Sequence, residues 1–254
     1  ATDPVPMDIS KGEMFRQGGS SYPRLVRLEN GEATATSPRG APPAEGAARF
    51  AAPVRDACTR RRGEDAIAAI LWAAWHPVLT AARTAPATQP RLVALVAAVR
   101  DLGPLPGRNR VWGLEVFTDL PCFGALLRET WDADPAGQVP LAAFAARLTS
   151  SGIDFSLHAL WALREHLEHP DPPRDLGAVL SWARHAGPVL AEHARTHRVF
   201  ADHDRGPDRL GPLALSRGID GHGFSPARWA FWRTRLAELG TPDSRAALDL
   251  LPPL

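Results

Sequence analysis

The sequence predicts an all-α fold, an irregular single-domain helical bundle of about seven to eight helices that follows a loosely ordered N-terminal arm. Three observations support this prediction. Apolar residues repeat at intervals of three and four from about residue 63 onward, which is the period of an amphipathic helix. Proline and glycine divide this pattern into short pieces, and strand-like signals are almost confined to residues 22–28. We therefore expect short, broken helices rather than a regular four-helix bundle.

The N-terminal region carries little of this pattern. Residues 32–46 are rich in Ala, Thr, Pro, Gly and Glu and hold almost no large apolar residue. Such a stretch cannot bury enough surface to offset the entropy lost on ordering. Residues 22–28 suit one short strand or a packed arm. The predicted division is an arm and Pro/Ala-rich linker over residues 1–60 and a helical domain over residues 61–254.

The first predicted helix begins with an acidic pair at residues 64–65, where the helix dipole favours negative charge. Its apolar stripe continues to Val78, although Pro77 is expected to kink or split it. A second helix begins near Pro90 and ends at Gly103, the residue type that commonly follows a helix C-terminus.

Prolines and polar caps mark most of the later helix starts. The loop over residues 103–120 is rich in apolar residues, so we expect it to pack inward. A second long loop, over residues 201–224, is dense in Asp, Gly, His and Arg. Further helices are predicted at about residues 121–131, 140–152, 154–167, 176–197 and 226–239, with Pro188 kinking the fourth of them.

Composition excludes several classes of partner. The 29 basic and 28 acidic residues give a formal net charge of +1, which argues against a nucleic-acid partner. We find no uninterrupted apolar run of about 18 residues and no signal-peptide pattern, so we predict no membrane partner and a cytoplasmic protein. Cys58 and Cys122 alone make no disulfide framework or zinc site. The oligomeric state stays open.

No cofactor is predicted, because the usual phosphate-binding glycine loops, the nucleophile elbow and paired C-x-x-C motifs are absent. His193 and His197 lie four residues apart on a predicted helix, with His185 upstream, a pattern that can bind a transition metal. However, Ala194 stands where an H-E-x-x-H motif has its glutamate, and a solvated polar face is the commoner explanation. We therefore predict no metal site.

Several short stretches share one order along residues 65–240. They are LWAAWH at 71–76, WG at 112–113, FTDLP at 117–121, RETWD at 128–132, FAARL at 144–148, LWALR at 160–164, GFS at 223–225 and RWAFW at 228–232. Together they resemble a family of fungal proteins labelled only as a domain of unknown function. The resemblance implies a filamentous-fungal source and an intracellular helical protein, often an accessory of specialised metabolism. It carries over no catalytic residues.

Eight tryptophans are many for a chain of this length, and several of them alternate with arginine. Arg128 precedes Trp131, and Trp161 precedes Arg164. A guanidinium over an indole face can hold a carbocation-like or anionic ligand, and indole-lined pockets commonly bind apolar ligands. The alternative is that the indoles fill gaps between irregular helices.

A functional pocket is predicted where the helix over residues 64–76, the loop over residues 110–120 and the helices of Trp131 and Trp161 meet. Three side chains are the candidate catalytic residues, because imidazole and carboxylate suit acid–base chemistry near neutral pH: His76, His158 and Asp119. The candidate substrate-binding residues are Trp75, Trp112, Arg128, Trp131 and Trp161. In the alternative interpretation, Asp119 caps the helix at Pro121 and Arg128 is a surface charge.

The resulting hypothesis is a small-molecule-acting protein of fungal specialised metabolism. Its best form is a cofactor-independent cyclase, isomerase, dehydratase or lyase that acts on an apolar metabolite. The alternative is a non-catalytic helical module that binds a protein or a ligand. The substrate, the product and the reaction class stay open.

Overall fold

The computed structural model describes residues 42–107, 110–201 and 206–254, and within them the chain is helical almost throughout. The α-helices are α1 (Pro43–Thr59), α2 (Glu64–Thr84), α3 (Gln89–Arg100), α4 (Phe123–Ala133), α5 (Gln138–Ser150), α6 (Ser156–Leu167), α7 (Gly177–Arg195), α8 (Pro212–Ser216), α9 (Pro226–Leu239) and α10 (Pro242–Leu250). The all-α prediction is confirmed, with ten helices in the described residues instead of seven to eight.

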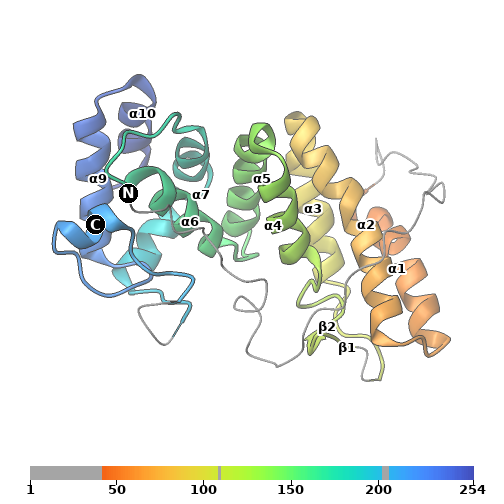
Figure 1. Ribbon diagram of the computed structural model, residues 1–254. Coiled ribbons are helices and arrows are strands. Elements are labelled where there is room, and N and C mark those ends of the chain that lie inside the picture. The colour runs from red at the N-terminus through yellow and green to blue at the C-terminus, as the bar shows by residue number, and fades with distance from the viewer. Residues whose placement is uncertain (1–41, 108–109, 202–205) are drawn as a thin grey trace.

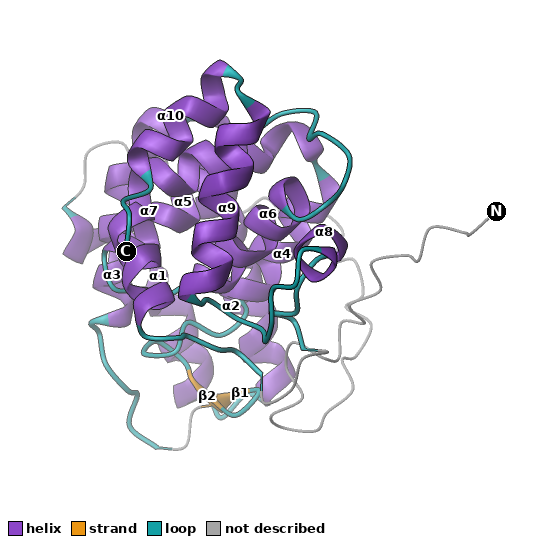
Figure 2. Ribbon diagram, turned by 90° about the vertical axis from the view of Figure 1, so that its left-hand side faces the viewer, coloured by secondary structure: helices purple, strands orange, loops and turns teal. Residues whose placement is uncertain are grey.

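The helices follow one another through the molecule in nearly their chain order. Figure 1 shows α1, α2 and α3 at one end, α4 and α5 in the middle, and α9 and α10 at the other end. Figure 2, viewed from that second end, shows α9 and α10 in front of the earlier helices. The most extensive helix pairing joins α5 to α7, and one cluster of buried apolar residues runs from Ala47 in α1 to Leu251 after α10.

The prediction of an arm and linker over residues 1–60 is wrong for residues 43–59, because these residues form helix α1. Proline at its start suits the first turn of a helix, and its buried face consists largely of small residues beside Phe50 and Val54. A Cβ on Gly46 would lie 3.0 Å from Leu95 Cδ1, so α1 packs closely against α3. The strand suggested at residues 22–28 lies outside the described residues.

Two helices continue through a proline at which we expected a kink or, at Pro77, a kink or a split. Helix α2 continues through Pro77 and α7 continues through Pro188. Both prolines are solvent-exposed, so water can satisfy the carbonyl left without its helical hydrogen bond. The opposite faces, with Trp75 in α2 and Leu190 in α7, are fully buried and keep each helix continuous through packing.

Helix α2 is long and apolar enough, by length and composition, to cross a membrane, although its apolar residues form no uninterrupted run. It is the one such helix among the described residues. Ile67, Leu71, Trp75 and Leu79 are buried on it, and it packs against α1, α4 and α5. The apolar residues of α2 therefore serve its packing against three neighbouring helices.

The apolar loop after α3 packs inward as predicted, burying Val111, Val116 and Phe117. It includes two paired strands, β1 (Arg110–Val111) and β2 (Leu114–Glu115), visible at the foot of the bundle in Figure 2. The hairpin turn between them is Trp112–Gly113, both with positive φ, as a tight two-residue hairpin turn requires.

Helix α10 was not predicted from the sequence, although Thr-Pro-Asp-Ser at residues 241–244 is a common helix start. Thr241 Oγ1 accepts a hydrogen bond from Ser244 N at 3.1 Å, the usual N-terminal cap. The helix docks on α7 at Gly187, where a Cβ would lie 2.8 Å from the backbone oxygen of Leu250. Glycine is therefore required at 187 by the close approach of these two segments.

Candidate functional site

A cavity of about 290 Å³ lies between α4, α6 and the segment that leads into α8. Helix α4 contributes two of its lining side chains, helix α6 contributes the largest share, and residues 209–212 close the remaining side. The lining residues are Arg128, Trp131, His158, Trp161, Ala162, Arg164, Glu165, His169, Arg209, Leu210, Gly211 and Pro212.

The α4 and α6 walls meet through an arginine–indole contact. The guanidinium of Arg128 lies 4.9 Å from the ring centroid of Trp161, a cation–π distance. Arg128 also forms an ion pair with Asp132 one turn later in α4, with 2.7 Å between Nη2 and Oδ1. Trp161 Nε1 donates a hydrogen bond to the carbonyl oxygen of Pro207 at 2.7 Å, which fixes the indole against the 206–212 segment.

His158 lines the cavity between two aromatic rings. Its ring centroid lies 5.6 Å from that of Phe155 and 4.9 Å from that of Trp161. Both ring nitrogens are buried and have no hydrogen-bond partner among the described residues. Burial and the charge of Arg128 lower the pKa of His158 to about 3, against the opposing effect of Asp154. The imidazole is therefore neutral at neutral pH.

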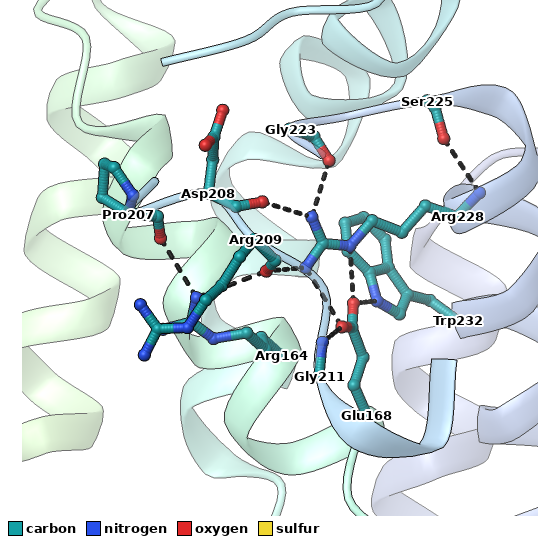
Figure 3. Close-up of polar contacts among 10 residues, drawn as sticks. All are labelled: Arg164, Glu168, Pro207, Asp208, Arg209, Gly211, Gly223, Ser225, Arg228 and Trp232. Carbon is teal, nitrogen blue, oxygen red and sulfur yellow. Dashed lines mark hydrogen bonds and ion pairs between the residues drawn. The ribbon is translucent and has the colours of Figure 1, made fainter. Parts of the chain in front are cut away.

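A buried ion pair holds residues 209–212, the third side of the cavity, in place. Arg228 of α9 and Glu168, the residue after α6, are both fully buried. Arg228 Nε lies 2.6 Å from Glu168 Oε1, and Nη2 lies 3.1 Å from Oε2 (Figure 3). Trp232 Nε1 donates to Oε1 at 2.7 Å and the backbone N–H of Gly211 donates to Oε2 at 2.6 Å. Each carboxylate oxygen thus accepts two hydrogen bonds.

The remaining donors of Arg228 fasten the irregular segment around it. Its Nη1 donates to the carbonyl oxygens of Asp208 and Gly223, at 2.9 and 2.8 Å, and its Nη2 donates to that of Arg209 at 3.0 Å. From the cavity side, Arg164 Nη1 donates to the carbonyls of Pro207 and Arg209, at 3.1 and 3.3 Å. Two arginines from different helices therefore hold the backbone of residues 207–209 from opposite sides.

The cavity carries an excess of positive charge on this side. Arg164 is buried, and burial together with the charges of Arg209 and Arg228 lowers its pKa to about 10, while Glu168 and Glu165 oppose the shift. The guanidinium remains protonated at neutral pH. Among the described residues, Glu165 is the one acidic side chain that lines the cavity, and it is exposed.

Four of the eight predicted site residues meet in this cavity: Arg128, Trp131, His158 and Trp161. The interpretation of Arg128 as a surface charge holds only in part, since it is half-buried against Trp161.

The other four predicted residues lie outside this cavity. The prediction that the pocket borders residues 64–76 and 110–120 is therefore wrong, since neither segment lines the cavity. Trp75 is fully buried in the core, with ring centroids 4.2 Å from Phe50 and 4.7 Å from Phe123. His76 is exposed, because successive helix residues point about 100° apart and Trp75 takes the inward direction.

The two predicted residues in the apolar loop serve its local structure. Trp112 lies in the hairpin turn between β1 and β2. Asp119 Oδ2 accepts a hydrogen bond from the backbone N–H of Glu115 at 2.8 Å, and the α4 cap position belongs to Cys122, so Asp119 does not cap that helix. Asp119 borders a separate depression of about 340 Å³. The thiol of Cys122 is buried beside it, and burial raises its pKa to about 12.

The histidines considered for a metal do not share a helix face. Helix α7 ends at Arg195, and His197 follows it with a left-handed backbone. His193 lies against Phe224 at 5.7 Å between ring centroids. Within the described ranges, no group of three or more His, Cys, Asp or Glu side chains is placed to hold a metal ion.

Sequence reasoning missed Glu168, Asp208 and Arg209 as site-forming residues. Arg228 begins the RWAFW stretch at residues 228–232, but its partner Glu168 is 60 residues away, and no local pattern joins them. The one available signal was the density of Asp, Gly and Arg in the 201–224 loop, which indicated a shaped segment without indicating its contacts.

The model of one protein family, described as "Protein of unknown function (DUF3632)", matches residues 75–236. The matched span contains every residue that lines the cavity and both members of the buried ion pair. The resemblance to a family of unknown function is thereby confirmed. No curated protein and no solved structure matches the chain.

Glu168→Gln is expected to lower the free energy of unfolding by about 3–5 kcal/mol, because it leaves the buried charge of Arg228 without its counter-charge. Urea unfolding followed by circular dichroism measures the change. Glu238→Gln removes the matching charge from the exposed ion pair with Arg217 and should change stability little. Similar small losses for both variants would contradict the role given to the buried pair.

His158→Leu is expected to weaken the acid dependence of stability. The folded-state pKa of His158 is lowered to about 3, so between about pH 6.5 and pH 3 the unfolded chain takes up a proton that the folded chain does not. This group therefore costs stability as pH falls through that range, by about 1.4 kcal/mol per pH unit. The measurement is the free energy of unfolding at pH 7 and at pH 4.5.

The control for this prediction is His76→Leu, which removes an exposed imidazole. It should keep the wild-type dependence. A His158→Leu variant that loses as much stability as the wild type between pH 7 and pH 4.5 would show that His158 is not held neutral by the fold.

Proposed function

The chain belongs to the family described as "Protein of unknown function (DUF3632)", and we propose from its cavity that it is a small-molecule-binding protein. The observation that carries the proposal is the convergence of Trp131, Trp161 and the unpartnered His158 on one cavity of about 290 Å³. Ligand sites are concave, largely apolar, and carry a few polar groups, and this volume suits a small ligand.

The ligand body is proposed to be apolar and planar. Trp161 has its ring held by the hydrogen bond to Pro207, and Trp131 and Leu210 add further apolar surface. Flat faces held in this way favour unsaturated or aromatic groups, which stack at low cost in lost freedom. This proposal keeps the apolar metabolite of the sequence hypothesis as the body of the ligand.

Catalysis is a second candidate, and His158 favours it. A buried imidazole without hydrogen-bond partners is costly in the free protein, which is explained if a ligand supplies the missing partners. A neutral imidazole in contact with a ligand can exchange a proton with it. We accordingly keep the cofactor-independent cyclase, isomerase, dehydratase or lyase as the enzymatic form of the proposal, with His158 as its acid–base residue.

For the compartment of the protein and the source of its ligand, we keep the hypothesis made from the sequence. The two cysteines are free thiols, which suits the reducing cytoplasm that we propose as its compartment. Fungal specialised metabolism is the proposed source of the ligand, and neither nucleic acid nor a membrane is a proposed partner.

Trp131→Ala is expected to weaken binding of a small aromatic probe at least about tenfold, because it removes one wall of the cavity. The probes are 2-naphthoate and naphthalene-2-methanol, and the measurement is isothermal titration calorimetry supported by ligand-observed nuclear magnetic resonance. Trp72→Ala, in a half-buried tryptophan of α2 outside the cavity, is the matched control. Binding of neither probe, or binding that Trp131→Ala leaves intact, would contradict the proposal.

His158→Ala is expected to lower turnover by about 10²–10⁴-fold if the protein is an enzyme. The assay incubates the protein with a small-molecule extract of its source organism and follows metabolite loss and product formation by mass spectrometry. His76→Ala is the control, since His76 lies outside the cavity and should keep activity. Equal turnover by His158→Ala would remove its acid–base role, and no turnover by the wild type would leave binding without catalysis.

A further inference from the structure

The charges that line the cavity are unevenly compensated. Three arginines of the described part of the chain line it, and Arg128 is already paired with Asp132. Arg164 and Arg209 form no ion pair with any carboxylate of the described residues. The hydrogen bonds that Arg164 Nη1 donates go to neutral carbonyl oxygens, so the charges of Glu165 and Glu168 act on it only through space.

Glu168, the buried carboxylate whose charge acts on Arg164, already has its own hydrogen-bond partners. Both carboxylate oxygens of Glu168 accept hydrogen bonds from Arg228, and they also accept from Trp232 Nε1 and from the backbone N–H of Gly211. Figure 3 shows the result: Arg228 and Glu168 lie on one side of the 207–211 segment, and the side chains of Arg164 and Arg209 lie on the other. The two guanidiniums on the cavity side repel each other, since the charge of Arg209 acts to lower the pKa of Arg164.

We propose that the ligand is a small organic anion whose oxyanion is bound by Arg164 and Arg209 and whose planar apolar body lies against Trp131 and Trp161. This inference rests on the proposed small-molecule function and names the class of ligand. An oxyanion supplies the missing counter-charge, and hydrogen bonds between guanidinium and oxyanion are strong where water is partly excluded.

His158 fits the same ligand as a neutral partner. A neutral imidazole has one N–H donor, and both nitrogens of His158 lack a partner among the described residues. Because both nitrogens are buried, the ring has to turn before it can donate to the oxyanion, and it adds no third positive charge beside Arg128. The cavity therefore offers an oxyanion two charged donors and an aromatic platform for its body, with a neutral imidazole beside them.

The test compares probes that share one body and differ in charge. The 2-naphthoate anion should bind the wild-type protein at least tenfold more tightly than naphthalene-2-methanol by titration calorimetry at 50 mM NaCl. Raising NaCl to 500 mM should weaken the naphthoate only, because screening acts on the charge. A third probe, 2-naphthyl phosphate, distinguishes a phosphate ligand from a carboxylate; preference for either anion over the alcohol supports the proposal.

Arg209→Gln is the decisive variant. The backbone carbonyl of Arg209, which Arg164 and Arg228 use, is retained, so the fold should be kept, as checked by near-ultraviolet circular dichroism. The variant should lower naphthoate affinity at least fivefold and leave the affinity for the alcohol unchanged. Arg217→Gln, which removes a surface arginine paired with Glu238, should change neither.

The measurements distinguish a failure of the anion inference from a failure of the small-molecule function. If all three probes bind with equal affinity, and Trp131→Ala weakens all of them while Arg209→Gln weakens none, the cavity is a ligand site and the anion inference is overturned. If no probe binds the wild-type protein, the small-molecule function itself falls, and the anion inference falls with it.

Discussion

The buried ion pair between Arg228 and Glu168 is the constraint on which the C-terminal half of the structure depends. Charges removed from water are tolerated only when their hydrogen-bonding capacity is filled, and the surroundings of this pair fill it. Arg228 takes its remaining acceptors from the backbone of residues 208, 209 and 223, and Glu168 takes its remaining donors from Trp232 and Gly211. The end of α6, the start of α9 and the loop between α7 and α8 are thus joined at one point.

The cavity follows from this arrangement, because the loop fastened by Arg228 forms the wall that faces α4 and α6. Gly211 shows how close the fit is: a Cβ there would lie 2.6 Å from Glu168 Cβ. With the backbone of residues 207–209 turned toward the two arginines, the side chain of Arg209 is left to line the cavity beside Arg164. The same contacts that stabilise the loop therefore concentrate positive charge at the proposed ligand site.

Among the side chains that line the cavity, His158 is the one with buried nitrogens that have no hydrogen-bond partner in the described residues. The Arg228–Glu168 pair on the α9 side has its hydrogen bonds filled, whereas the cavity side holds an unpartnered imidazole and two guanidiniums without carboxylate partners in the described residues. Proteins keep such costly features mainly where function needs them. The two indoles, the unpartnered imidazole and the two guanidiniums that line this cavity are the physical basis for placing the ligand here and not in the second depression beside Asp119.

The sequence by itself determined the all-α class and the positions of most helices, because the 3.6-residue period and caps such as Ser225 are local signals. The sequence also identified Arg128, Trp131, His158 and Trp161 as candidate site residues, because a tryptophan close to a charged residue can be recognised in the sequence. Only the tertiary structure decided that α1 is part of the core, because burial of small alanines depends on the neighbours that approach them. It alone decided the direction of His76 and the pairing of Glu168 with Arg228, because contacts across 60 residues arise from packing and leave no trace in local periodicity.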